Sequence, residues 1–179
     1  ASTFRVSRIY VTSPNGGEVY RAGIVYPIKW NVSSDITSLK LEYTTDDGLN
    51  WVTINNNVNP ASGTYNWKMP DTASTGYRIR ISDALVSAEI SDTSDNIFTV
   101  KKLQLNSPNS ATNWLANTNQ TITWASTGIN QVMLQYTTNN GANWVNITST
   151  PLSAFTGNYI WVTPNLSSPS VKVRIYDYT

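Results

Sequence analysis

Two stretches, LKLEYTTDDGLNW (39–51) and VMLQYTTNNGANW (132–144), carry the pattern that decides the fold. In each of them apolar residues alternate with polar ones, and this period of two is typical of a strand that buries one face. The polar residues that follow include Asp or Asn and then Gly. These residues accept backbone N–H groups and adopt positive φ in tight hairpins. Each stretch therefore predicts a strand, a turn and the start of a second strand.

The two stretches belong to a longer internal repeat whose copies lie 93 or 94 residues apart. YNWKMP (65–70) returns as YIWVTP (159–164), and RIRISD (78–83) returns as KVRIYD (172–177). Self-similarity at a fixed spacing indicates two copies of one domain. The single residues that recur at this spacing include Tyr20 and Trp114, Ile28 and Ile122, Trp30 and Trp124, Tyr43 and Tyr136, and Trp51 and Trp144.

Each copy has the strand content of a small β-sandwich. About seven short strands within some ninety residues, divided by Pro, Gly, Asn and Asp and without a helical stretch, predict an immunoglobulin-like or fibronectin-like sandwich. We therefore expect an all-β chain with a segment 1–8, a sandwich 9–101 and a second sandwich 102–179. The strands expected in the first copy are 9–12, 18–20, 24–31, 38–44, 51–54, 64–67, 77–82 and 97–101.

The composition excludes several classes of function. The chain has 12 Lys and Arg against 11 Asp and Glu, so the sequence offers no electrostatic case for nucleic acid as a partner. It has no Cys and no His, which removes thiol nucleophiles, imidazole bases and disulfides. No apolar run approaches the roughly 20 residues of a membrane helix. We expect no enzyme, no metal, no cofactor and no membrane insertion.

The second copy lacks a match for the last strand of the first. It stops at Thr179, shortly after the residue that matches Asp83, so Phe98 and Val100 have no counterpart there. The missing pattern stands at the beginning of the chain, where TFRVSRIYVTSPN (3–15) matches IFTVKKLQLNSPN (97–109) without a gap. We therefore predict a donor strand made of Thr3, Phe4, Arg5, Val6 and Ser7, and an acceptor groove beside Val171, Val173 and Ile175.

This arrangement favours a structural subunit of an extracellular filament. A sandwich without its last strand exposes unpaired backbone and an apolar groove, which a strand from another molecule can cover. Because each molecule would donate to the next, the expected partner is the chain itself, joined head to tail by donor-strand complementation. The alternative is a fragment of a tandem-repeat secreted adhesin or of a carbohydrate-binding surface protein, with surface glycans as partners. A fragment cut from such an array could begin and end at these same positions of the repeat.

The first copy also resembles a known family. SPNGGEVYRAGIVYPIKW (13–30), LEYTTDDGLNWVTI (41–54) and SDTSDNIFTV (91–100) resemble prokaryotic surface repeats related to the fungal Ser/Thr-rich cell-wall family of β-1,6-glucan assembly. The resemblance is looser in the second copy, where SPNSATNW (107–114) replaces the Asn-Gly-Gly-Glu stretch. It implies an extracellular β-sandwich and supplies no catalytic residue. By mechanism, the donated strand resembles chaperone–usher pili and archaeal thread filaments.

Three further signals have simpler structural interpretations. TTDDGLNW (44–51) fits the Asp-box of sialidase propellers, but a tight hairpin needs the same residues, and the second copy has Asn139 in place of Asp46. Asp92 and Asp95 have no partners that would indicate a hydrolase or a calcium site. Most of the tryptophans recur on alternating strands, so we expect them in the cores. Asn31, Asn119, Asn146 and Asn165 stand in Asn-x-Ser/Thr sequons and are the glycosylation candidates.

Overall fold

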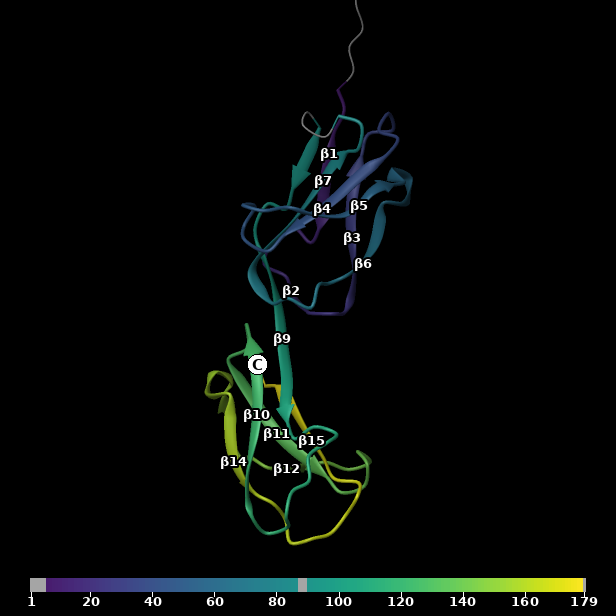
Figure 1. Ribbon diagram of the computed structural model, residues 1–179. Coiled ribbons are helices and arrows are strands. Elements are labelled where there is room, and N and C mark those ends of the chain that lie inside the picture. The colour runs from purple at the N-terminus through teal and green to yellow at the C-terminus, as the bar shows by residue number, and fades with distance from the viewer. Residues whose placement is uncertain (1–5, 87–89, 179) are drawn as a thin grey trace, which may run out of the picture. The chain divides into compact units, whose positions relative to one another are not determined.

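The computed structural model describes residues 6–86 and 90–178, and the chain divides between Lys101 and Lys102 into two compact units (Figure 1). The described residues contain β-strands and two short 3₁₀ helices, and no α-helix. The prediction of an all-β chain built from immunoglobulin-like or fibronectin-like sandwiches is confirmed. Neither 3₁₀ helix has the length or the apolar character needed to cross a membrane.

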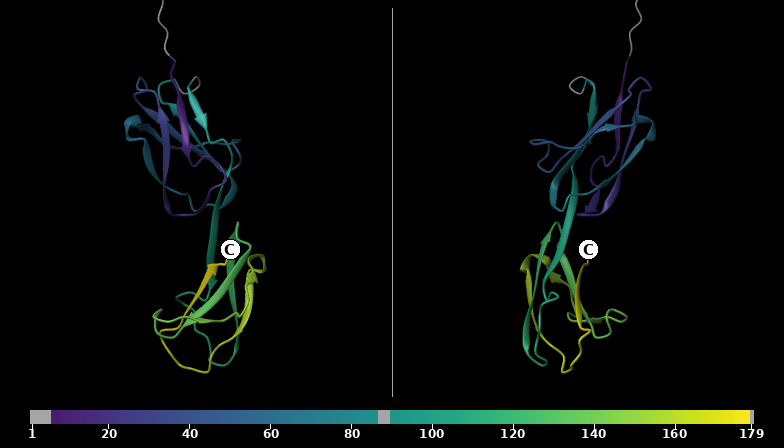
Figure 2. Two further views of the ribbon diagram at one scale, coloured as in Figure 1. Left: turned by 180° about the vertical axis from the view of Figure 1, so that it is seen from behind. Right: turned by 45° about the vertical axis from the view of Figure 1, so that its right-hand side comes forward.

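Unit 1 consists of two sheets, which can be followed from three sides in Figures 1 and 2. One sheet has the strand order β1-β3-β6. In the other, β9 pairs with β2 and β7, β7 also pairs with β8 and β4, and β4 pairs with β5. The bounds are β1 Ile9–Ser13, β2 Val19–Arg21, β3 Val25–Val32, β4 Leu39–Thr44, β5 Val52–Val58, η1 Pro60–Ser62, β6 Thr64–Lys68, β7 Ser74–Asp83, β8 Ser91–Thr93 and β9 Phe98–Ser107.

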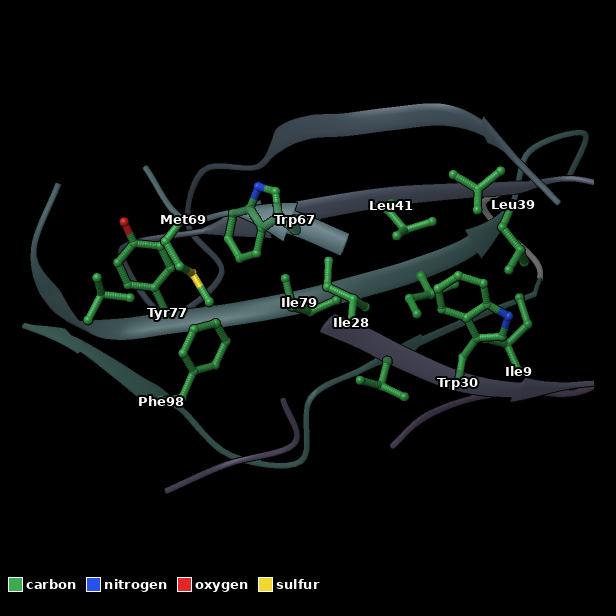
Figure 3. Packing of buried hydrophobic residues seen from close by; sticks show 14 of the residues in the cluster. Ile9, Ile28, Trp30, Leu39, Leu41, Trp67, Met69, Tyr77, Ile79 and Phe98 are labelled. Atoms are coloured by element: carbon green, nitrogen blue, oxygen red, sulfur yellow. The ribbon is translucent and has the colours of Figure 1, made fainter. Parts of the chain in front are cut away.

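The core of unit 1 follows from the alternation in its strands. Ile28 and Trp30 of β3 are buried while the residues between and beside them are exposed. Leu39, Leu41 and Ile79 contribute the facing layer, and each of them has no exposed surface. Figure 3 shows these side chains packed between the strands. Every second residue points inward in a strand, so this pattern could be predicted before the fold was known.

The closing strand of unit 1, which we define as residues 98–101 of β9, fills the space between β7 and β2. Phe98 pairs with Tyr77 of β7, and the ring centroids of these two residues lie 5.4 Å apart. Figure 3 shows the Phe98 ring beside Tyr77. On the other side Thr99 lies opposite Val19 of β2 and donates from its backbone N–H to the Glu18 carbonyl at 2.9 Å. Phe98 is 1% exposed, so the closing strand completes the core.

Unit 2 repeats the first sheet and part of the second. The later residues of β9, from Lys102 on, pair with β10, and β10 pairs with β14, which reproduces the order β1-β3-β6. The second sheet is built on β11, which pairs with β12, β13 and β15. The bounds are β10 Asn119–Thr127, β11 Gln131–Thr137, β12 Val145–Asn146, β13 Leu152–Ser153, η2 Ala154–Thr156, β14 Asn158–Val162 and β15 Lys172–Asp177.

The two units share their pairing register. Tyr43 lies opposite Ile79 in unit 1, and the matching Tyr136 lies opposite Val173 in unit 2. The sequence repeat is therefore also a structural repeat.

Two features of unit 1 differ from the sequence-based expectation. The segment 83–95, expected as a plain connection, contains the short strand β8, which pairs with β7. The strand expected over 51–54 runs on to Val58, because β5 follows β4 through two register shifts.

Candidate functional site

Unit 2 has a cavity of about 460 Å³ at one end of its sandwich. We call this cavity the slot. None of the residues that line it carries a charge, so it suits an apolar or neutral occupant better than an ion. Its walls include Trp114, Leu115, Trp161, Thr163, Val171 and Val173.

The slot lies where unit 1 holds its closing strand. In unit 1 that strand runs between β2 and the first half of β7. With the repeat spacing of 94 residues, the matching segments of unit 2 are 113–115 and 168–172. Residues 113–115, Ser168 and Val171 line the slot. Among the described strands, β15 pairs with β11 alone, and residues 113–115 form no strand.

The side chains of β7 and β15 differ in burial as this correspondence requires. Tyr77 and Ile79 of unit 1 have no exposed surface, and the ring of Phe98 packs against that of Tyr77. Their counterparts in unit 2 are Val171, which is 39% exposed, and Val173, which is only partly buried. An apolar surface that unit 1 keeps dry is therefore accessible to solvent in unit 2.

The backbone around the slot is held in the same way as in unit 1. The Thr163 N–H donates to the Thr118 carbonyl at 3.0 Å, as Met69 does to Ile24 at 2.9 Å in unit 1. The Thr163 hydroxyl, which is new in unit 2, donates to the Leu115 carbonyl at 2.6 Å. The slot therefore has a fixed rim, although none of the strands in the described part of the chain passes through it.

The predicted site residues fall in three places. Thr3, Phe4 and Arg5 lie outside the described residues, whereas Val6 is 73% exposed and the Ser7 hydroxyl donates to Asp35. Val171 and Val173 line the slot. Ile175 packs against the core of unit 2 beyond the slot.

The structure adds wall residues that sequence reasoning missed. Trp114, Thr163 and Ser168 match Tyr20, Met69 and Ser74 at the repeat spacing, so the repeat itself held the signal. In unit 1 Val100 pairs with Ser74. The matching positions of unit 2 are 168–171, which lie earlier along the chain than most of the expected groove.

The tryptophans offer no flat sugar-binding platform. Trp30, Trp67, Trp124 and Trp161 are buried. Trp51 and Trp144, the other recurring pair, are each covered by an arginine. The guanidinium of Arg80 lies 4.2 Å from the ring centroid of Trp51, and that of Arg174 lies 4.2 Å from the ring centroid of Trp144. Trp114, half-buried on the slot wall, has its ring centroid 6.2 Å from that of Trp161. Among the tryptophans of the described residues, Trp114 on the slot wall is therefore the one that is neither in a core nor covered by an arginine.

The Asp-box segments form matching turns. Asp46 accepts from the Asn50 backbone at 2.9 Å, and Asn139 accepts from the Asn143 backbone at 3.0 Å. Hydrogen bonds, first from the Thr44 hydroxyl and then from Asn50, lower the pKa of Asp46 to about 2. In residues 6–86 and 90–178 no three Asp, Glu, His or Cys side chains come together as metal ligands would.

One buried carboxylate, Glu42, lies on β4 of unit 1. Burial by itself raises the pKa of Glu42, but hydrogen bonds from Lys40 and Arg80 outweigh burial and lower it. Lys40 approaches Glu42 at 2.7 Å, and Arg80 at 2.8 Å. Arg80 also covers Trp51, so these charges fix the outer face of the sheet. The matching position in unit 2 is Gln135, which accepts from Arg174 at 2.7 Å.

The four sequon asparagines Asn31, Asn119, Asn146 and Asn165 are all exposed. They differ in what their surroundings allow. Asn146 accepts a hydrogen bond from Gln135, and its sequon threonine, Thr148, is buried. Asn165 and its sequon serine, Ser167, are both exposed.

No family model matches the chain, and no curated protein matches its sequence. The resemblance to the Ser/Thr-rich cell-wall family therefore stays a prediction. Solved structures to which this chain is similar include the fibronectin(III)-like modules of Clostridium thermocellum CbhA, at 19% identity and a TM-score of 0.32 over 95% of this chain and 86% of that one. The FN1-FN3 domains of chicken CNTN1 are 10% identical, with a TM-score of 0.34 over 94% of this chain and 59% of that one. Dpr2 Ig1-Ig2 in complex with DIP-Theta Ig1-Ig3 is 13% identical, with a TM-score of 0.33 over 93% of this chain and 56% of that one.

Proposed function

We propose that the protein is a structural subunit of an extracellular filament, and that the slot of unit 2 receives residues 3–7 of a second copy of the chain. The observation that carries this proposal is the cavity of about 460 Å³ at the place that the closing strand fills in unit 1. No cofactor and no catalytic step form part of the proposal.

The choice of occupant rests on the sequence repeat. Phe4 and Val6 occupy the same positions of the repeated sequence pattern as Phe98 and Val100, and both copies of the pattern continue through Ser-Pro-Asn. In unit 1 the side chains of Phe98 and Val100 lie in the core and are at most 1% exposed. Full burial of one such apolar side chain contributes about 1.5–3 kcal/mol. Residues 3–7 therefore carry side chains of the right kind and spacing for the slot.

The register of unit 1 gives the docked arrangement. Phe4 would lie opposite Val171 and enter the space beside Trp114, as Phe98 lies opposite Tyr77 beside Tyr20. Val6 would lie opposite Ser168, as Val100 lies opposite Ser74. The strand would lie antiparallel to 168–171 and parallel to 113–115, so that it faces backbone on both sides, with Pro169 contributing a carbonyl but no N–H.

The filament would be polar, with a free donor segment at one end and a free slot at the other. Unit 1 is closed by a strand of its own chain, so each molecule offers one slot and one donor segment. The donor segment leads directly into Ile9, the first residue of β1. A contact between two different surfaces repeats from molecule to molecule and produces a filament unless the rotation closes a ring.

The test uses two full-length variants that each lack one half of the contact. Phe4→Asp should remove the donor and Val171→Asp the acceptor, while Leu49→Asp is the control, because Leu49 lies in a turn of unit 1 and is 83% exposed. Sedimentation velocity and electron microscopy should find filaments for the original chain and the control, and monomers for each variant alone. A mixture of the two variants should give 1:1 dimers, because each contributes its one intact half.

Either of two results would overturn the proposal. The original chain could remain monomeric up to its solubility limit, or Phe4→Asp could assemble as the original chain does. Amide NMR spectra of both variants would establish that the units are folded, so that loss of assembly is not mistaken for unfolding.

A second candidate is a module of a tandem-repeat surface adhesin or carbohydrate-binding protein. Unit 1 favours it, because its closing strand comes from its own chain and leads directly into the next unit. In that case the slot would be closed by residues of the same polypeptide, and Phe4 would have no role in it. Indifference of the oligomeric state to Phe4→Asp distinguishes this candidate from the first.

A further inference from the structure

We propose that Val171 and Thr163 make the slot a specificity pocket, which accepts a donor strand with an inward side chain larger than phenylalanine. This inference rests on the proposed function, since it names the class of strand that the same slot can take. It predicts that the slot and the matching position of unit 1 do not accept the same strands.

In unit 1 the space around the Phe98 side chain is fully packed. The ring of Phe98 lies 5.4 Å from that of Tyr77 and 5.6 Å from that of Tyr20. Tyr77 has no exposed surface and Met69 is 2% exposed. The Tyr77 hydroxyl donates to the Thr72 carbonyl at 2.6 Å, which fixes the ring. Because packed cores resist added volume, a residue larger than Phe98 would force these side chains apart.

Two walls of the slot are smaller than their counterparts. Val171 stands where unit 1 has Tyr77, and Thr163 stands where unit 1 has Met69. Trp114 replaces Tyr20 and recovers a part of the lost volume. The Thr163 hydroxyl is held by its bond to the Leu115 carbonyl, so this side chain cannot swing in to fill the gap.

The incoming strand must therefore occupy space that unit 2 does not fill itself. In unit 1 two rings share this region, Tyr77 from β7 and Phe98 from the closing strand. In unit 2 the receiving strand contributes only a valine. Atoms beside an unfilled gap lose packing contacts, so a larger ring at position 4 should gain contacts there that phenylalanine leaves unmade. Tryptophan and tyrosine donors form the class that this pocket suits.

The experiment compares donor peptides on one protein. The full-length Phe4→Asp variant, which keeps an empty slot, is titrated with the peptide ASTFRVSR and with the same peptide carrying Trp, Tyr or Asp in place of Phe. Isothermal titration calorimetry gives each Kd. We expect the Trp peptide to bind as tightly as the Phe peptide or up to about tenfold more tightly. The Asp peptide should not bind.

A swap of the wall residue provides the matched control. Val171→Tyr in the same variant restores the wall of unit 1, so it should weaken the Trp peptide more than tenfold relative to the Phe peptide. Phe98→Trp should lower the unfolding midpoint of unit 1, because that position has no spare room.

The outcomes separate the two proposals. If the Phe peptide binds and the Trp peptide binds tenfold more weakly, the specificity pocket is refuted and donor-strand complementation stands. If none of the peptides binds to the folded variant, both proposals fail. If Val171→Tyr weakens binding of the Phe peptide and of the Trp peptide equally, a selective role for Val171 is also refuted.

Discussion

Removal of the Phe98 ring tests the physical basis of the slot, because this ring should anchor the closing strand of unit 1. Phe98 is 1% exposed and contacts the rings of Tyr20 and Tyr77. Truncation of a buried phenylalanine to alanine removes the transfer free energy and leaves a cavity, which together cost about 3–5 kcal/mol. Phe98→Ala should therefore lower the free energy of unfolding of unit 1 by this amount and leave unit 2 nearly unchanged.

The measurement is a urea titration followed by amide NMR signals, so that each unit reports separately. Val100→Ala is the milder companion in case Phe98→Ala does not fold, and it should cost about 1.6 kcal/mol for the two buried methyl groups. Leu49→Ala, at a site that is 83% exposed, is the control and should stay within about 0.5 kcal/mol of the original chain. A loss of less than about 1 kcal/mol for Phe98→Ala would show that the ring does not anchor the closing strand. The comparison between Phe98 and Phe4 would then fail.

The remaining predictions concern the turns of the two repeats. Because the pKa of Asp46 is lowered to about 2, the ionised carboxylate stabilises unit 1 above its unfolded-state pKa near 3.8, and this contribution should disappear as the pH falls through 4 to 2. Thermal unfolding of Asp46→Asn across this range should lack that part of the pH dependence, and a dependence as large as that of the original chain would contradict the assignment. Gly48→Ala and Gly141→Ala should each destabilise their own unit by about 1 kcal/mol or more, because these glycines have φ of 99° and 102°. Gly76→Ala tests close packing instead, since the added Cβ would lie 3.1 Å from the Thr45 carbonyl oxygen. A neutral result for Gly48→Ala in urea denaturation would mean that the turn relaxes to accept a side chain.

The strands and the repeat could be predicted from the sequence because both depend on local order. A period of two fixes which side chains share a face, so Leu39 and Leu41 could be assigned to a core before any neighbour was known. The turns could be predicted too, since Asp47 and Asn140 precede glycines and adopt positive φ in both copies. The match between residues 3–15 and 97–109, on which the proposed donor segment rests, could be recognised for the same reason, as a second copy of a short pattern.

Only the tertiary structure decided how the site is built. The register that places Phe98 opposite Tyr77 and Val100 opposite Ser74 results from pairing between distant strands, and no local pattern encodes it. The same register applied to unit 2 shifts the expected contact toward 168–171. Trp114 and Thr163 line the slot there. The fold also placed Trp51 and Trp144 under arginines rather than in the cores. The sequence determined which side chains face inward, whereas the folded chain determined which inward-facing position is left unfilled, because a cavity depends on residues far apart in sequence.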